Sequence, residues 1–342
     1  MNWWKRLKAN PLAKFGAIVL IVLYTSVIFA DLITPYKAEE SVKYAALLPP
    51  TQIYWQTPQG EFIGPHVYPT TQGTVNLETG DRSLLVDFSK PSKILLFQNG
   101  HLFSTSGTGR LNLLGTDEQG RDQLTRLLFG GRFSLFIGII GTAISFSVGS
   151  IVGAISGYFG GLIDTVLMRL AEVLMSVPSI YLLVALAAVL PPQIDNMQRF
   201  VLIVVLVSFI SWAGLARVIR GQVLSIKEQE FITAAKATGA SPLRIILRHV
   251  LPQTATYLII SATLSIPSFI GAEAVLSLVG LGIQPPAPSW GNMLSLSTNA
   301  SIIVLQPWLI WAPAVLIVLT VLSFNLLGDG LRDALDPQNV QR

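Results

Sequence analysis

Residues 230–253 have the sequence EFITAAKATGASPLRIILRHVLPQ, a polar and basic stretch set between two apolar ones. Its composition predicts a first helix that ends at Gly239, because glycine suits the left-handed cap after a helix. Ser241 and Pro242 suit the cap and the first position of a second helix, and Pro252 is expected to stop that helix. We therefore predict two short helices that meet at a sharp corner.

The first helix is expected to be slim on one side, because Ala234, Ala235 and Ala237 carry only methyl groups there. Positive charge surrounds it, from Lys236, Arg244 and Arg248. A slim, basic helix that interrupts an apolar chain indicates an element that docks into a partner protein. An ordinary helix-turn-helix connector is the alternative that this stretch alone leaves open.

The rest of the chain has the composition of a membrane protein. Hydrophobic residues make up 51% of it and charged residues 12%, whereas a soluble domain has about 25% charged residues. Six apolar runs approach or exceed the length that a membrane-spanning helix needs: residues 12–33, 133–155, 166–190, 200–216, 255–281 and 308–327. Because unpaired backbone groups are costly in lipid, these runs are predicted to be helices.

The distribution of Lys and Arg predicts the orientation. These residues gather near both termini and in the connection that holds residues 230–252, whereas the two short connections on the other side offer only Arg199. By the positive-inside rule, both termini and the 230–252 segment are expected to be cytoplasmic. The net charge of +4 fits contact with membrane lipid better than binding to nucleic acid, since the basic residues flank spans.

Residues 34–114 break the membrane pattern and are expected to form a small β-containing extracytoplasmic insertion. Within them, Asn99 and Gly100 separate the apolar runs KILLFQ and HLFS, which is a strong hairpin signal. Thr116 and Gln119 have the spacing of a capping box for a helix that leads into the second span.

Three groups inside the spans are candidate sites. Small residues recur at every fourth position of the second span and predict a helix-packing seam: Gly141, Ser145, Gly149, Gly153 and Gly157. Arg169 and Glu172 are spaced to pair on one helix face. Glu273 is an intramembrane carboxylate that faces either a cavity or an interface, and the absence of a basic partner in a neighbouring span favours the interface.

Several function classes are excluded by missing motifs. No Lys follows a Gly, so the chain has no Walker A loop and no P-loop ATPase site of its own. It has no G-x-S-x-G elbow and no cysteine, and its three histidines are divided between the two sides of the membrane. We therefore expect a protein that is not an enzyme, with no catalytic residue, no metal site and no cofactor.

The 230–253 stretch resembles the cytoplasmic coupling loop of ABC importer permeases. That loop has the pattern Glu-Ala-Ala, three residues, Gly, nine residues, Ile, one residue, Leu-Pro. The matching residues are Ala234, Ala235, Gly239, Leu251 and Pro252, whereas Thr233 stands in place of Glu and His249 in place of Ile. The resemblance implies a coupling site for an ATPase subunit made of Thr233, Ala234, Ala235, Lys236, Gly239, Arg244, Leu251 and Pro252.

A wider resemblance covers residues 114–336. Four stretches are similar, in order, to signatures of the C-type permease subunit of dipeptide, oligopeptide and nickel ABC importers: LLGTDEQGRDQLTRLLFGGRFSL, GYFGGLIDTVLMRLAEVLMSVPS, EAVLSLVGLGIQPPAPSWGNML and FNLLGDGLRDALDPQ. The main departure is a long insertion between residues 47–50 and 113–117. The resemblance implies an all-α polytopic membrane protein with the six-helix, methionine-importer-like fold of type I ABC importer permeases.

The same resemblance implies the organisation and the partners of the protein. Its parts would be the N-terminus and first span (1–33), the insertion (34–114), the permease domain (115–330) with coupling loop 227–252, and a cytoplasmic tail (331–342). It would work in the cell inner membrane with a second, different permease subunit, two ATP-binding subunits and an extracytoplasmic substrate-binding protein. An ion-gradient-driven secondary transporter and a scaffold protein remain the alternatives. Peptide, nickel chelate and other small solutes remain open as substrates.

Overall fold

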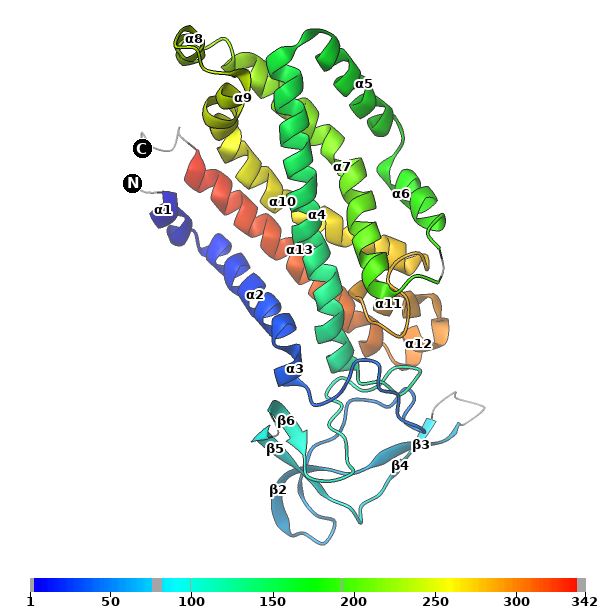
Figure 1. Cartoon of the computed structure of the whole chain (residues 1–342). Coiled ribbons are helices and arrows are strands. Elements are labelled where there is room, and N and C mark those ends of the chain that lie inside the picture. Colours follow the sequence, from blue (N-terminus) through cyan, green and yellow to red (C-terminus); the bar gives the residue numbers. More distant parts are fainter. Residues whose placement is uncertain (1–2, 76–81, 99, 192, 337–342) are drawn as a thin grey trace. The chain divides into compact units, whose positions relative to one another are not determined.

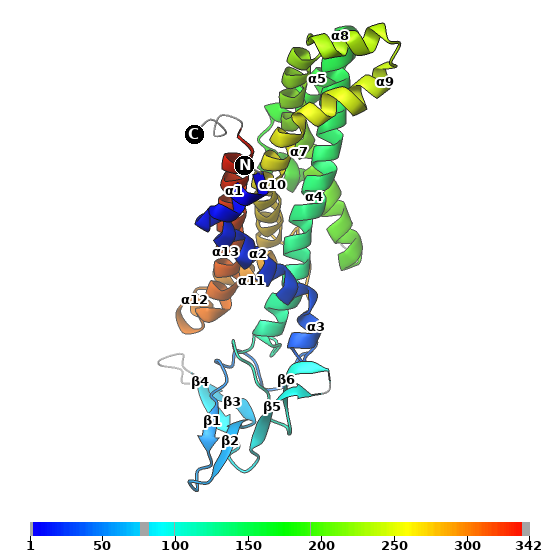
Figure 2. The same ribbon diagram turned by 90° about the vertical axis from the view of Figure 1, so that its left-hand side faces the viewer.

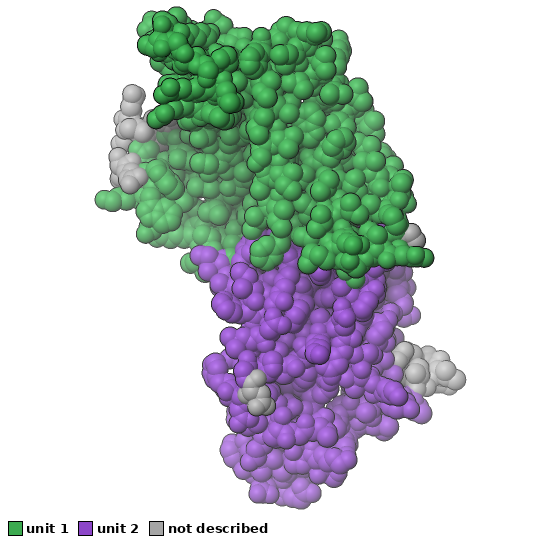
Figure 3. All heavy atoms as spheres, viewed as in Figure 1, with its two compact units in different colours: residues 1–20, 136–276, 319–342 green, residues 21–135, 277–318 purple. Residues whose placement is uncertain are grey.

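The computed structural model of the chain describes residues 3–75, 82–98, 100–191 and 193–336 (Figure 1). The chain divides into two compact units, which we call unit 1 and unit 2 (Figure 3). Unit 1 contains residues 1–20, 136–276 and 319–342, and unit 2 contains residues 21–135 and 277–318.

Most of the described chain is helical. The long helices are α2 (Pro11–Ile28), α4 (Gln123–Phe159), α5 (Gly161–Ser176), α7 (Asn196–Ile226), α10 (Leu251–Leu278) and α13 (Trp308–Leu335). The short ones are α1 (Trp3–Ala9), α3 (Ala30–Ile33), α6 (Ser179–Ala188), α8 (Glu230–Ala237), α9 (Pro242–Ile245), the π-helical turn η1 (Ile246–Val250), α11 (Trp290–Leu294), the 3-10 turn η2 (Ser295–Thr298) and α12 (Ala300–Leu305).

Among the described residues, five helical segments are long and apolar enough to cross a membrane, and a bent pair of helices adds a sixth candidate. The pair is α5 and α6, which meet at an angle of 86°. The run 166–190, which the sequence predicts as one span, is divided between them. The bend lies at Val177 and Pro178, where proline cannot donate a backbone hydrogen bond and holds Val177 in an extended conformation (φ −100°, ψ 132°).

The second predicted span and the helix that leads into it form one continuous helix, α4. The predicted capping box at its start is wrong. Thr116 lies in the preceding turn, where its hydroxyl donates to the carbonyl of Ala45 at 2.5 Å. The cap is instead Asp122, whose carboxylate accepts from the backbone N–H of Thr125 at 2.8 Å. Gly120, in the left-handed region at φ +74°, turns the chain before the helix can begin.

The predicted β-structure of the insertion is present. One sheet has the strand order β1 (Tyr54–Gln56), β2 (Phe62–Val67), β5 (Ser92–Gln98), β6 (His101–Thr105), and β3 (Thr70–Val75) pairs with β4 (Arg82–Val86). The predicted hairpin is confirmed, since β5 and β6 pair antiparallel with Gln98 opposite His101. Asn99 of its turn lies outside the described residues, and Gly100 has φ +78°.

The two ends of the insertion lie side by side within unit 2. The backbone N–H of Thr51 donates to the carbonyl of Asn112, and the N–H of Asn112 donates to the Thr51 hydroxyl, each at 2.9 Å. Beside this junction Arg110 donates to Glu40 at 2.5 Å, and this hydrogen bond lowers the pKa of the Glu40 carboxyl. The strands therefore leave and rejoin the helical part of the chain at nearly one point.

In unit 1, the first and last helices of the chain pack against each other. Leu7, Ala13 and Ala334 form one buried cluster. This contact places α1 and the end of α13 together.

Candidate functional site

The 230–253 stretch forms the predicted pair of short helices, in unit 1. Figures 1 and 2 both show α8 and α9 at the same end of the unit as the start of α5. Gly239 follows α8 with φ +81°, a conformation that favours glycine. Ser241 has the extended backbone of a helix cap and Pro242 is the first residue of α9, but the predicted side-chain cap is absent because Ser241 makes no capping hydrogen bond.

The predicted stop at Pro252 is wrong. Instead of ending, α9 continues through the wider turn η1 into α10, and Pro252 is the second residue of α10. Pro252 is therefore an interior proline, and the wider π-helical turn η1 directly before it is where the backbone hydrogen bond that proline cannot donate would fall. The chain thus runs from α9 into a membrane-length helix without a loop.

Four buried side chains fasten the two short helices to unit 1. Ile232 of α8 and Ile245 of α9 are almost wholly buried, as are Ile246 and Val250 of η1. They form one apolar cluster with residues of α4 and α7, namely Ala154, Leu215, Ile219 and Val223. Because closely packed side chains transmit displacement, a force on α8 and α9 reaches these two long helices directly.

The opposite side of the short helices is exposed. Thr233, Ala234, Lys236, Gly239, Arg244 and Pro252 are all exposed, whereas Ala235 and Leu251 are half-buried against the apolar cluster. Leu243 and Leu247 add large exposed apolar surface at 66% and 56%. Lys236 lies with its ammonium 5.7 Å from the ring centre of Tyr158, at the end of α4. The structure therefore brings all eight predicted coupling residues into one segment, six of them on its open side.

The row of small residues on α4 lies against α7 over most of its length. An ideal Cβ on Gly149 would lie 2.9 Å from the carbonyl oxygen of Trp212, and one on Gly153 would lie 2.5 Å from that of Ala216. A Cβ on Gly157 would lie 2.8 Å from the carbonyl oxygen of Arg220. Ser145 is buried, and Gly141 faces Phe269 of α10.

An ion pair that sequence reasoning missed ties α5 to α7. Asp164, in the first turn of α5, accepts from Arg220 of α7 through both carboxylate oxygens, at 2.5 and 2.6 Å. Ser156 of α4 donates to the same carboxylate at 2.5 Å. The only signal in the sequence is an Asp soon after Gly160 and Gly161, because its partner is 56 residues away.

The three predicted intramembrane polar residues fall into an exposed pair on α5 and a single buried residue on α10. Arg169 and Glu172 of α5 form an exposed ion pair of 2.9 Å, and Arg217 of α7 lies 3.7 Å from Glu172. Glu273 is fully buried within α10. The carboxylate of Glu273 thus belongs to the interior of the chain, whereas the Arg169–Glu172 pair lies on its surface.

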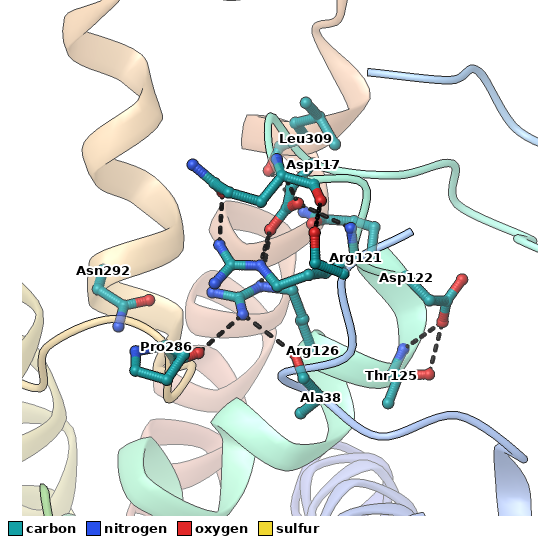
Figure 4. Close-up of polar contacts among 12 residues, drawn as sticks. Ala38, Asp117, Arg121, Asp122, Thr125, Arg126, Pro286, Asn292 and Leu309 are labelled. Carbon is teal, nitrogen blue, oxygen red and sulfur yellow. Dashed lines mark hydrogen bonds and ion pairs between the residues drawn. The ribbon is translucent and has the colours of Figure 1, made fainter. Parts of the chain in front are cut away.

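A buried polar cluster lies at the start of α4 in unit 2 (Figure 4). Asp117 accepts from Nε of Arg121 at 2.7 Å, and Nε of Arg126 lies 3.2 Å from the same oxygen. Arg126 also donates to the carbonyls of Ala38 and Pro286. The sequence alone predicts no role for these residues, because an ordinary surface turn has the same composition.

Within the described residues, no group of three or more His, Cys, Asp and Glu side chains is placed to hold a metal ion. What the geometry offers is an anchored surface at α8 and α9, close helix packing behind it, and apolar spans.

Comparison with known proteins identifies the family. The family described as binding-protein-dependent transport system inner membrane component matches residues 149–340. The chain belongs to this family of membrane permeases. A second family, the N-terminal TM domain of oligopeptide transport permease C, matches residues 2–50.

Relatives of the permease carry names from the same family. The dipeptide transport system permease protein DppC of Bacillus subtilis is 33% identical over 98% of this chain and 84% of its own length. The oligopeptide transport system permease protein OppC of Haemophilus influenzae is 43% identical over 67% of this chain and 71% of its own. OppC of Escherichia coli K12 is 40% identical over 74% of this chain and 78% of its own.

Among solved structures, the MetNI methionine ABC transporter in an inward-facing conformation aligns with a TM-score of 0.48 and 22% identity, covering 62% of this chain and 98% of that one. Family membership and the apolar helical spans confirm the fold class predicted from the sequence: a polytopic helical permease with a small β-containing insertion.

Proposed function

We propose that the chain is the membrane-spanning permease subunit of an ATP-driven ABC importer for peptides. It would form the translocation pathway with a second permease subunit, receive solute from an extracytoplasmic binding protein, and couple to two separate ATP-binding subunits. The dipeptide and oligopeptide transport names of its relatives support peptides as the substrate class.

The observation that carries the proposal is the anchored pair α8 and α9. Its outer side offers the small residue Ala234 and the exposed Leu243, which suit insertion into a groove of a partner. Its inner side is fixed to α4 and α7 through Ile232 and Ile245. A connector with no partner would need neither the exposed apolar surface nor a rigid attachment.

The coupling mechanism follows from this attachment. Closure of the ATP-binding subunits would displace α8 and α9, and the apolar cluster would pass the displacement to α4 and α7. The Asp164–Arg220 pair would carry it on to α5. The pathway then alternates between inward-facing and outward-facing states, with nucleotide as the ligand that shifts the equilibrium.

The decisive experiment is ATP hydrolysis by the assembled complex. The permease, its partner permease and the ATP-binding subunits are co-expressed and purified in nanodiscs, and hydrolysis is measured with and without binding protein. We expect hydrolysis that needs the ATP-binding subunits and rises with loaded binding protein. Peptide uptake that persists without those subunits and follows an imposed ion gradient would instead establish a secondary transporter.

The orientation belongs to the same proposal. We place α8, α9 and both termini in the cytoplasm, because the basic residues gather there. A cysteine introduced at Ser241, which is exposed, should resist a membrane-impermeant maleimide in intact cells and react in inside-out vesicles. Labelling in intact cells would reverse the topology.

The insertion is proposed to contact the binding protein or the partner permease and not the transported solute. Because Thr51 and Asn112 are hydrogen-bonded to each other, a short Gly-Ser linker can replace residues 52–108 without moving the helices. We expect weaker stimulation of ATP hydrolysis by binding protein and unchanged basal hydrolysis. Unchanged half-saturation by binding protein would show that the insertion has no docking role.

A further inference from the structure

We propose that the polar cavity at the start of α4 is a binding subsite for a carboxylate, and that it takes the C-terminal carboxylate of a peptide. This inference rests on the proposed peptide substrate and names a site for it. The cavity lies wholly within unit 2. Its lining comes from the turn before α4, the first turns of α4, the chain after α10, and α11.

The size of the cavity suits one end of a chain. Its volume is about 310 Å³, at the lower end of the about 300–1,000 Å³ of small-ligand pockets. It therefore has room for the terminal residues of a peptide.

Two buried arginines form its charged wall. The side chains of Arg121 and Arg126 are only 10% and 5% exposed. Both share the single carboxylate of Asp117, so these three groups carry one excess positive charge. A buried cation without a full counterion is costly, and an anion that enters the cavity would supply the missing charge.

Donor groups remain available for that anion. Arg121 uses Nε for Asp117 and Nη2 for Gln119, and Arg126 uses Nη1 for Ala38 and Pro286. Within the described residues, Nη1 of Arg121 and Nη2 of Arg126 form no hydrogen bond. A fully buried nitrogen without a hydrogen bond would be an unsatisfied buried atom, and neither of these two nitrogens is one. Each therefore keeps accessible surface from which it can donate.

The cluster holds these donors rigidly. Asp117 fixes both guanidinium groups, and the carbonyls of Ala38 and Pro286 hold the far side of Arg126 in Figure 4. Asn292 beside them is fixed through the carbonyls of Ile283 and Ala287. Guanidinium groups held in one geometry bind carboxylates better than mobile ones, because less side-chain freedom is lost on binding.

Of the remaining acidic groups, Glu39 acts on Arg126 through its charge, but it is exposed and does not line the cavity. Asp122 is hydrogen-bonded to Thr125 and does not line the cavity. Glu118 does line it but is exposed to solvent, so its charge is screened. Glu118 therefore provides a rim charge that should oppose an incoming carboxylate weakly.

The test compares two probes on one protein. The full permease complex in nanodiscs, without binding protein, is titrated with trialanine and with trialanine amide. We expect the amide to bind at least about ten-fold more weakly, since it lacks one charge-assisted hydrogen bond. Equal binding of the two probes would overturn the proposal.

Variants locate the effect. Arg121→Lys keeps the charge but loses the forked geometry, and it should remove most of the difference between the two probes. Because Arg121 also holds Asp117, the second variant is Glu118→Gln, whose side chain is exposed and forms no ion pair within the described residues. It should tighten binding of trialanine about two-fold, as loss of one screened rim charge predicts, and leave the amide unchanged. A difference between the probes that survives in Arg121→Lys would place the carboxylate elsewhere.

A second arm separates the two sources of a carboxylate. If the wild type treats both peptides alike but Arg121→Lys weakens binding of the binding protein, the carboxylate belongs to an acidic side chain of that protein, and the peptide assignment is wrong. The titration needs neither ATP nor uptake, so it can succeed where the proposed transport function fails. Conversely, if the complex takes up the amidated peptide as well as the peptide with a free carboxylate, this subsite is wrong while the proposed transport function stands.

Discussion

The two ends of helix α4 are held by different chemistry. Its later half, in unit 1, lies against α7 through Gly149, Gly153 and Gly157, with backbone against backbone. Its start, in unit 2, is held by Asp122 and by the Asp117–Arg126 pair, both buried. Close packing of small residues tolerates no added volume, whereas a charged cluster tolerates no change in charge. The two ends should therefore fail under different substitutions.

The largest effect is expected from added volume in unit 1. Gly153→Leu would force a side chain against the carbonyl oxygen of Ala216 and Ile219, and overpacking costs about 1–3 kcal/mol or more. We expect little intact complex to be recovered in mild detergent. Gly149→Leu should behave in the same way.

Val148→Leu is the matched control, because Val148 lies on the same helix and is 40% exposed. Equal recovery of the three variants would show that the glycine row is not a packing seam.

The next effect concerns backbone geometry at the coupling segment. Gly239→Val should abolish transport while membrane insertion continues, because valine strongly disfavours φ near +81°. Uptake and membrane-fraction abundance are measured together. Gly221→Val, at an exposed helical position with no other atom within 4 Å of its ideal Cβ, should keep most activity. Wild-type uptake by the Gly239 variant would remove the docking role from this segment.

A smaller effect is expected at the charged contact inside unit 1. Asp164→Asn breaks a bidentate pair that is partly buried. We expect the free energy of unfolding to fall by on the order of 1–3 kcal/mol, and the coupling of ATP hydrolysis to uptake to weaken. The charge-reversed double variant Asp164→Arg with Arg220→Asp should restore part of both.

Glu172→Gln serves for comparison, since its ion pair with Arg169 is exposed and exposed pairs contribute about 0–1 kcal/mol. If the double variant is no more stable and no better coupled than the single variants, the contact between Asp164 and Arg220 does not cause the effect.

The smallest effect is a pH dependence in unit 2. Burial raises the pKa of Asp122 from its usual 3.8 to about 6. Between these values the folded protein binds more protons than the unfolded one, so stability falls as pH rises from about 4 to 6 and stays lower above 6. We expect the melting temperature at pH 7 to lie below that at pH 5. In Asp122→Asn, where the amide oxygen still accepts from Thr125, this difference should shrink. An unchanged difference would assign it to other groups.

Features set by neighbouring residues could be predicted from the sequence in both units, whereas contacts between distant residues could not. The glycine row, the corner at Gly239 and the hairpin before His101 are repeated or local patterns, and each is determined by residues close together in the chain. The Asp117–Arg126 cluster includes Ala38 and Pro286, and the Asp164–Arg220 pair spans 56 residues. One sequence does not show which distant charges meet. The error at Thr116 has the same cause, because its hydroxyl donates to the carbonyl of Ala45, 71 residues away. The error at Pro252 is local, because the wider turn η1 lets the helix continue past the proline.

The paired ends of the insertion make it a practical attachment point. Since Thr51 and Asn112 are joined by two hydrogen bonds, one between backbone groups and one to the Thr51 hydroxyl, a foreign domain whose own termini are adjacent can be spliced there as a cassette. A fluorescent or affinity domain at this junction would mark one face of the membrane without entering a helix.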